Sequence, residues 1–113
     1  GYEGMIREAF VLNYGKTAVS VLDVDRFKED HTAYTIVDVR NKSEVMDKKI
    51  FSNSINIPLA DLRNKIDKIP TNKPIVVHCA GGYRSAAASS LIQSELNGKA
   101  YVFDLSEAIK QFN

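Results

Sequence analysis

The sequence lacks three features that would each place it in a large class of proteins. It has one cysteine, Cys79, which cannot form a disulfide within the chain, so a reducing cytoplasmic location is expected. It has little net charge, with 15 Lys and Arg against 14 Asp and Glu, whereas a dedicated nucleic-acid-binding protein needs a basic surplus. No apolar run approaches the roughly 20 residues of a membrane-spanning helix, and no signal peptide is recognisable. We therefore expect a cytoplasmic protein that binds neither nucleic acid nor membrane.

The chain has 113 residues, the size of one ordinary domain. Its composition, 44% hydrophobic and 26% charged, is typical of a globular protein. It begins with glycine rather than methionine, which suggests a piece of a longer protein. We expect residues 1–16 to be a linker or the tail of a preceding domain, and residues 17–113 to form the domain itself.

Short β-branched runs alternate with helical stretches along most of the chain. Strands are predicted at residues 18–22, 35–39, 54–57, 75–79 and 100–103. Helices are predicted at residues 23–27, 43–46, 59–66, 84–96 and 106–112. This alternation predicts an α/β fold with a central, mostly parallel sheet of about five strands and helices on both faces. In such a sheet, active sites form where the carboxyl ends of strands meet the following loops.

Cys79 lies at such a place, because it ends a buried strand and is followed by a short loop and a helix. The loop residues that we assign to the candidate site are Ala80, Gly81, Gly82, Tyr83 and Ser85. Glycines let a loop turn tightly and point backbone N–H groups inward, and the helix N-terminus adds the positive end of its dipole. A thiol there should have a lowered pKa, and the thiolate is the nucleophilic form. Arg84 is expected to place a fixed positive charge beside it.

The segment Cys-Ala-Gly-Gly-Tyr-Arg-Ser, residues 79–85, resembles the Cys-x-x-Gly-x-Arg-Ser active-site loop of rhodanese-like domains. Asp38-Val39-Arg40, followed by Glu44, is similar to that family's early Asp-x-Arg segment, and residues 54–58 are similar to its Ala-x-Asn-Ile-Pro strand. In that family, the cysteine takes sulfane sulfur from thiosulfate or a glutathione persulfide and passes it to cyanide or a thiol. The resemblance implies a three-layer fold and a sulfurtransferase with Cys79 as nucleophile. It implies no metal or organic cofactor.

The Ala-Gly-Gly-Tyr form of the loop also resembles rhodanese domains fused to metallo-β-lactamase-fold persulfide dioxygenases, which would make residues 1–4 the tail of a preceding domain.

The chain departs from the family pattern near its end. The family often has a Gly-Gly pair before its last helix and a tryptophan near the helix end, where this sequence has Glu107-Ala108 and Phe112. A glutamate at the pocket rim would either repel an anionic donor or be solvated, and we favour solvation because glutamate is rarely buried unpaired.

Two other interpretations stay open at the level of sequence. A non-enzymatic interaction or regulatory module could use the same fold, since fold does not fix function. A cysteine-dependent phosphatase or arsenate reductase also combines a thiolate, backbone amides and an arginine. Such enzymes have one residue more between cysteine and arginine than the four present here. The shorter loop encloses a smaller cavity, which suits a terminal sulfur atom better than a tetrahedral oxyanion.

Three further polar residues lie close to the predicted strand ends. His78 should face away from Cys79 as a core histidine, because neighbouring residues of a strand point to opposite faces. Asp38 is expected to anchor local backbone or to pair with a cation. For Arg40, a structural role and a role in the pocket, where it would help to recruit an anionic donor, both stay open. One cysteine and two separated histidines lack the paired spacing of zinc ligands, so no metal site is predicted.

Overall fold

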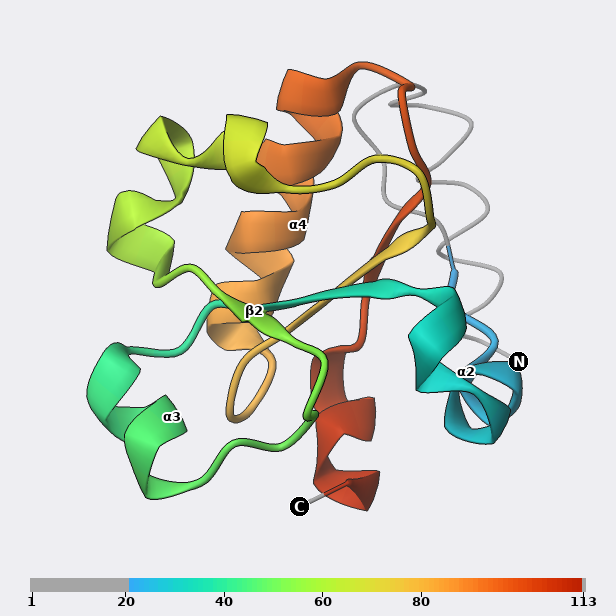
Figure 1. The fold of residues 1–113 in the computed structure, drawn as a ribbon, viewed down its shortest axis with the longest axis vertical. Helices are drawn as coiled ribbons and strands as arrows, with labels where there is room; N and C mark the ends of the chain where they lie inside the picture. The colour runs from blue at the N-terminus through green and yellow to red at the C-terminus, as the bar shows by residue number, and fades with distance from the viewer. Residues whose placement is uncertain (1–20, 113) are drawn as a thin grey trace.

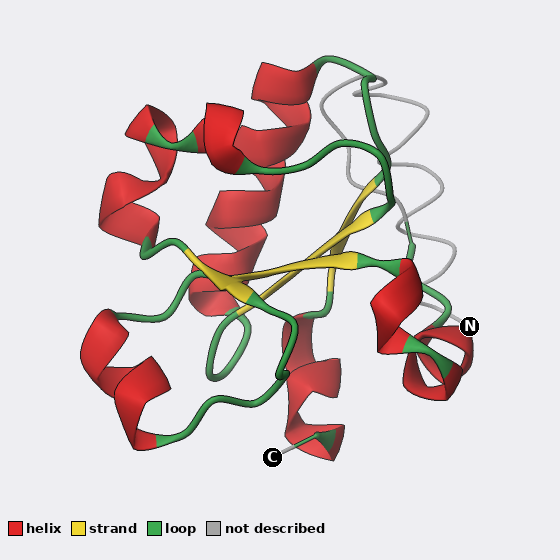
Figure 2. Cartoon of the chain, in the orientation of Figure 1, coloured by secondary structure: helices red, strands yellow, loops and turns green. Residues whose placement is uncertain are grey.

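The computed structural model describes residues 21–112, which form a parallel sheet flanked by helices (Figures 1 and 2). The sheet has four strands within these residues, in the order β2-β1-β3-β4. They are β1 (Thr35–Asp38), β2 (Ile55–Asn56), β3 (Ile75–His78) and β4 (Val102–Asp104). All neighbouring strands are parallel, and β1 pairs with β3 in a register that sets Val37 opposite Val77. The predicted α/β fold is confirmed.

The strand expected at residues 18–22 is not one of these four strands. Residues 18–20 lie outside the described part of the chain, and Val21 and Leu22 belong to no strand. The other strands lie where the β-branched runs predict them, each within two residues of the expected bounds.

Helices occupy both sides of the sheet. The α-helices are α2 (Val24–Glu29), α3 (Lys42–Asp47) and α4 (Tyr83–Leu96), and the 3-10 helices are η2 (His31–Ala33), η3 (Leu59–Asn64), η4 (Ile66–Lys68) and η5 (Ser106–Gln111). The segments predicted as helical at 59–66 and 106–112 are wound as 3-10 helices, the tighter form that occurs in short pieces. The Asp23 side chain caps α2 by accepting a hydrogen bond from the backbone N–H of Arg26 at 3.2 Å.

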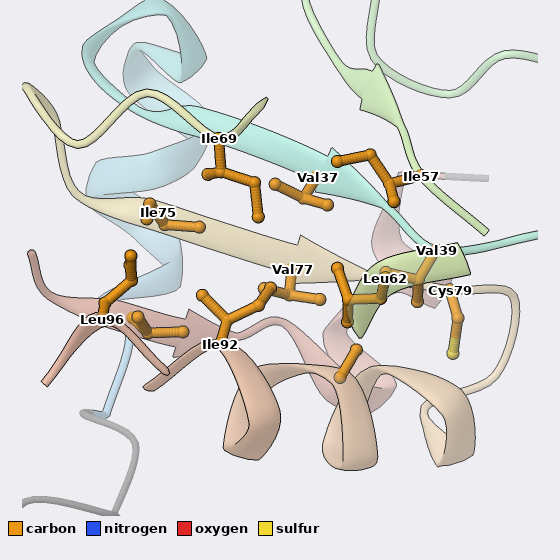
Figure 3. Packing of buried hydrophobic residues seen from close by; sticks show 12 residues of the cluster. Val37, Val39, Ile57, Leu62, Ile69, Ile75, Val77, Cys79, Ile92 and Leu96 are labelled. Carbon is orange, nitrogen blue, oxygen red and sulfur yellow. The ribbon is translucent and has the colours of Figure 1, made fainter. Parts of the chain in front are cut away.

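The core consists of two apolar clusters, one on each face of the sheet. Val37 and Val77 face the cluster that includes Ile92 of α4 and Leu62 of η3. Figure 3 shows this cluster, with Cys79 at the edge where the chain leaves β3 and approaches the start of α4. The opposite cluster holds Ile36 and Val76, together with residues of α2 and η5. Strands β1 and β3 are therefore buried on both faces, which explains the consecutive apolar residues at their centres.

Candidate active site

The Cys79 side chain lies at the carboxyl end of β3, inside the loop that leads to α4. It is only 2% exposed. Its Sγ atom accepts hydrogen bonds from the backbone N–H groups of Gly82 at 3.0 Å and Ser85 at 3.4 Å. Gly82 precedes α4 with a φ of 114°, a left-handed conformation that glycine adopts readily. This turn aims backbone N–H groups at the sulfur atom, as the loop sequence predicts.

The hydrogen bonds around Cys79 favour its ionised form. Burial of the thiol raises the pKa of Cys79, but hydrogen bonding to Ser85, Gly82 and Gly81 lowers it by more, so the net pKa lies below the usual value. The thiolate is the form that acts as a nucleophile. The loop therefore holds a cysteine that is both activated and shielded from bulk water.

The remaining loop residues divide between the inside and the outside of the turn. Ser85 is fully buried, and its hydroxyl donates a hydrogen bond to the Gly82 carbonyl at 3.1 Å, which fixes the turn. Ala80 and Gly81 are exposed, and the Tyr83 side chain is 93% exposed beside the start of α4. A molecule that approaches the loop from solvent would meet Tyr83.

Arg84 forms a bidentate ion pair with a residue that the sequence analysis did not assign to the site. Its Nη1 and Nη2 atoms donate to Oε1 and Oε2 of Glu44 at 2.6 and 3.0 Å. Hydrogen bonding from Arg84 lowers the pKa of Glu44 to about 2, and hydrogen bonding to Glu44 raises the pKa of Arg84. Negative charge on Cys79 makes a smaller contribution to the raised pKa of Arg84. The positive charge expected beside Cys79 is thus present but paired.

Asp38 and Arg40 form a second, buried ion pair behind the site. The Arg40 Nη2 atom donates to Oδ2 of Asp38 at 2.8 Å and to the Lys48 carbonyl at 2.9 Å. The two side chains are 7% and 0% exposed. Asn56 donates to the carbonyls of both residues at 2.9 Å and so ties β2 to the end of β1. Of the two roles left open for Arg40, these contacts correspond to the structural one.

His78 is buried on the face of the sheet opposite Cys79, as strand alternation predicts. Its ring packs edge-on against Phe51, with centroids 5.1 Å apart. Its Nδ1 atom lies 3.3 Å from the Cys79 carbonyl, and its Nε2 atom lies 3.6 Å from Oδ2 of Asp38. Burial lowers the pKa of His78 in spite of the opposing effect of Asp38, so the ring is neutral near pH 7. The histidine supports the core and does not reach the thiol.

Within residues 21–112, the structure groups no three His, Cys, Asp or Glu side chains in a way that could hold a metal ion. None of the helices in the same part of the chain is long and apolar enough to cross a membrane.

Comparison with known proteins decides the family. The model of the rhodanese-like domain family matches residues 20–113. The chain belongs to this family. A rhodanese-related protein from Thermoplasma volcanium is 33% identical, with 83% of this chain and 88% of that chain covered and a TM-score of 0.68.

Two further proteins are similar to this rhodanese-like domain. A NAD-dependent persulfide reductase from A. fulgidus is 31% identical, with a TM-score of 0.59. The similarity covers 89% of this chain but only 17% of the reductase chain. The uncharacterized protein YqhL of Bacillus subtilis is 25% identical over 99 residues, which is 88% of this chain and 76% of that protein. The predicted fusion to a metallo-β-lactamase-fold domain stays a prediction, and residues 1–16 lie outside the described part of the chain.

Proposed function

We propose that this rhodanese-like domain is a cytoplasmic sulfurtransferase that carries sulfur as a persulfide on Cys79. The observation that carries the proposal is the pair of backbone N–H groups, from Gly82 and Ser85, that converge on the Sγ atom at 3.0 and 3.4 Å. Fixed N–H donors around a sulfur nucleophile stabilise negative charge on it without any reorganisation during the reaction. The similarity to the persulfide reductase from A. fulgidus supports a persulfide as one class of donor.

The reaction would proceed by two displacements at sulfur. The Cys79 thiolate attacks the outer sulfur of thiosulfate or of a thiol persulfide. The S–S bond of the donor breaks, and sulfite or a thiolate leaves with the electron pair. A thiol or cyanide acceptor then attacks the outer sulfur of the Cys79 persulfide, and the electron pair of that bond returns to Sγ as the thiolate. The sequence of steps gives ping-pong kinetics and needs no external oxidant, reductant or cofactor.

Intact mass measurement tests this function directly. The reduced protein is incubated with thiosulfate or glutathione persulfide, and the product is then treated with cyanide or a thiol. A gain of one sulfur atom that the acceptor removes is expected for the wild type and not for Cys79→Ser. A gain that persists in Cys79→Ser would remove Cys79 from this role. If the reduced wild-type protein gained no sulfur from either donor, the alternative of a non-enzymatic interaction or regulatory module would be favoured.

A further inference from the structure

The ion pair between Glu44 and Arg84 joins α3 to the first turn of α4, directly beside the sulfur-binding loop. It is bidentate, with contacts of 2.6 and 3.0 Å, and the two side chains are 32% and 33% exposed. Arg84 lies between Tyr83 and Ser85 in the chain, and the Ser85 N–H donates to Sγ of Cys79. The charges of Glu44 and Arg84 therefore attract or repel charged molecules that approach the Cys79 thiolate.

Glu44 holds its position and its charge through two sets of contacts. Besides the pair with Arg84, its Oε1 atom accepts a hydrogen bond from the backbone N–H of Asn41 at 3.0 Å and completes the capping box of α3. Its pKa of about 2, set mainly by hydrogen bonding from Arg84, keeps it ionised under physiological conditions. The Glu44 carboxylate is thus a negative charge that both sets of contacts hold in place.

The consequence is that the positive charge of Arg84 is offset before any donor arrives. The groups that contact the sulfur itself are neutral N–H groups of Gly82 and Ser85. A doubly negative donor such as thiosulfate would meet an anionic thiolate without a full compensating positive charge, whereas a donor with one negative charge or none would meet much less repulsion.

We infer that Glu44, by pairing with Arg84, determines which sulfur donors the Cys79 site prefers. The site then selects persulfides of low charge over dianions such as thiosulfate. The identity of the ligand as a sulfur donor rests on the proposed function, but the selection by charge can be measured without it. In the transfer from such a persulfide, the S–S bond of the donor breaks and its thiolate leaves with the electron pair as the new bond to Sγ forms. Glu44 touches neither sulfur and is a positioning residue for Arg84.

Alkylation of Cys79 by a pair of matched reagents tests the inference. Iodoacetate carries one negative charge, and iodoacetamide has nearly the same shape and no charge. Both react with the thiolate, so the ratio of their rates cancels the thiolate fraction and the access to the loop. Cys79 is the single cysteine of the chain, so intact mass reports on this residue. The rates are measured at low ionic strength, where screening is weak.

Glu44→Gln is the test variant, because glutamine keeps the hydrogen-bonding shape and can still complete the capping box. The iodoacetate to iodoacetamide ratio should rise about fivefold, the size expected for removing one charge at several ångströms from the reagent in a partly solvated site. The matched control is Asp47→Asn, which removes a charge from an exposed position at the end of the same helix, and its ratio should stay at the wild-type value. A purely structural role for Glu44 would slow both reagents together and leave the ratio unchanged.

The same variants are then compared with two sulfur donors, thiosulfate with two negative charges and methanethiosulfonate with one. Sulfur uptake from thiosulfate, relative to methanethiosulfonate, should rise in Glu44→Gln in parallel with the alkylation ratio. An unchanged alkylation ratio in Glu44→Gln, or an equal rise in Asp47→Asn, would overturn the inference. A raised alkylation ratio without sulfur uptake from any donor would leave charge selection standing and would refute the sulfurtransferase proposal instead.

Discussion

Gly82 and Ser106 lie backbone against backbone beside Cys79, so that a β-carbon added to Gly82 would be 3.4 Å from the carbonyl carbon of Ser106. Gly82 also has a φ of 114°, and its N–H lies 3.0 Å from Sγ of Cys79. Ser106 itself has a φ of 55°, which is uncommon for a residue other than glycine. The position of the Gly82 N–H relative to the sulfur thus depends on the conformation of Gly82 and on its contact with the start of η5.

Gly82→Ala should slow sulfur uptake by Cys79 about tenfold, a loss typical of a conformational strain of one to three kcal/mol. Alanine rarely adopts a φ of 114°, so the backbone must shift and carry its N–H away from the sulfur, while the added β-carbon itself would be in ordinary van der Waals contact with Ser106. The rate of mass gain from a persulfide donor measures the effect.

Gly81→Ala is the matched control in the same loop. A β-carbon on Gly81 would meet no atom within 4 Å, and this residue has no positive φ. Its uptake rate should stay within about twofold of the wild type, since exposed substitutions of this kind have small effects. Equal losses in the two variants would show that the fit of Gly82 against Ser106 is irrelevant to the reaction.

The pH dependence of Cys79 alkylation should reflect its lowered pKa. The rate with iodoacetamide follows the thiolate fraction, so its midpoint should lie below about 8.5, the ordinary value that the urea-unfolded chain should show. In Gly82→Ala, the midpoint should move upward, because one of the hydrogen bonds that favour the thiolate is weakened. A folded midpoint at or above that of the unfolded chain would contradict the role of the loop N–H groups.

The sequence was sufficient to predict that Cys79 lies in a glycine-containing loop at the start of a helix, because Cys79, the two glycines and the start of α4 lie within a few residues of one another. It also predicted which way His78 points, since alternation along β3 is a local rule. The parallel sheet and its two-sided core follow from the alternation of strands and helices, whereas the strand order does not.

Glu44 could not be assigned to the site in the same way, because it is 40 residues from Arg84 in the sequence. The two side chains meet only because β1 and β3 are neighbours in the sheet and α3 and α4 follow these strands at the same edge. The left-handed conformation of Ser106 was equally beyond prediction, since it is a residue type that seldom adopts it. Long-range pairing and strained backbone are tertiary properties that a local pattern does not encode.

Arg84→Ala should return the pKa of Glu44 from about 2 toward the ordinary value of about 4.3, which a carboxyl NMR titration measures. A lowered carboxyl pKa stabilises the fold above the unfolded pKa, and this contribution is lost as pH falls toward 2. The wild type should therefore lose more stability than Arg84→Ala between pH 5 and pH 2. The ratio of the thiosulfate rate to the iodoacetamide rate should also be lower in Arg84→Ala than in the wild type, because the negative charge of Glu44 then has no positive partner. A Glu44 pKa that stays near 2 in the variant would mean that another group, and not Arg84, sets it.

Asp38→Asn should destabilise the fold by about 3 kcal/mol, measured by urea denaturation. The Asp38 side chain is fully buried, and Arg40, only 5% exposed, would keep its charge with no carboxylate to balance it. Asparagine keeps one acceptor oxygen for the Arg40 N–H groups, but its NH2 group cannot accept the hydrogen bond that Oδ2 takes from Nη2 of Arg40. The loss therefore combines an unpaired guanidinium with a lost hydrogen bond. Asp47→Asn, which removes a carboxylate from an exposed position, should change stability by no more than about 0.5 kcal/mol. If the two variants were equally stable, the buried ion pair would contribute nothing to the fold, and Arg40 would be available for the alternative role of recruiting an anionic donor.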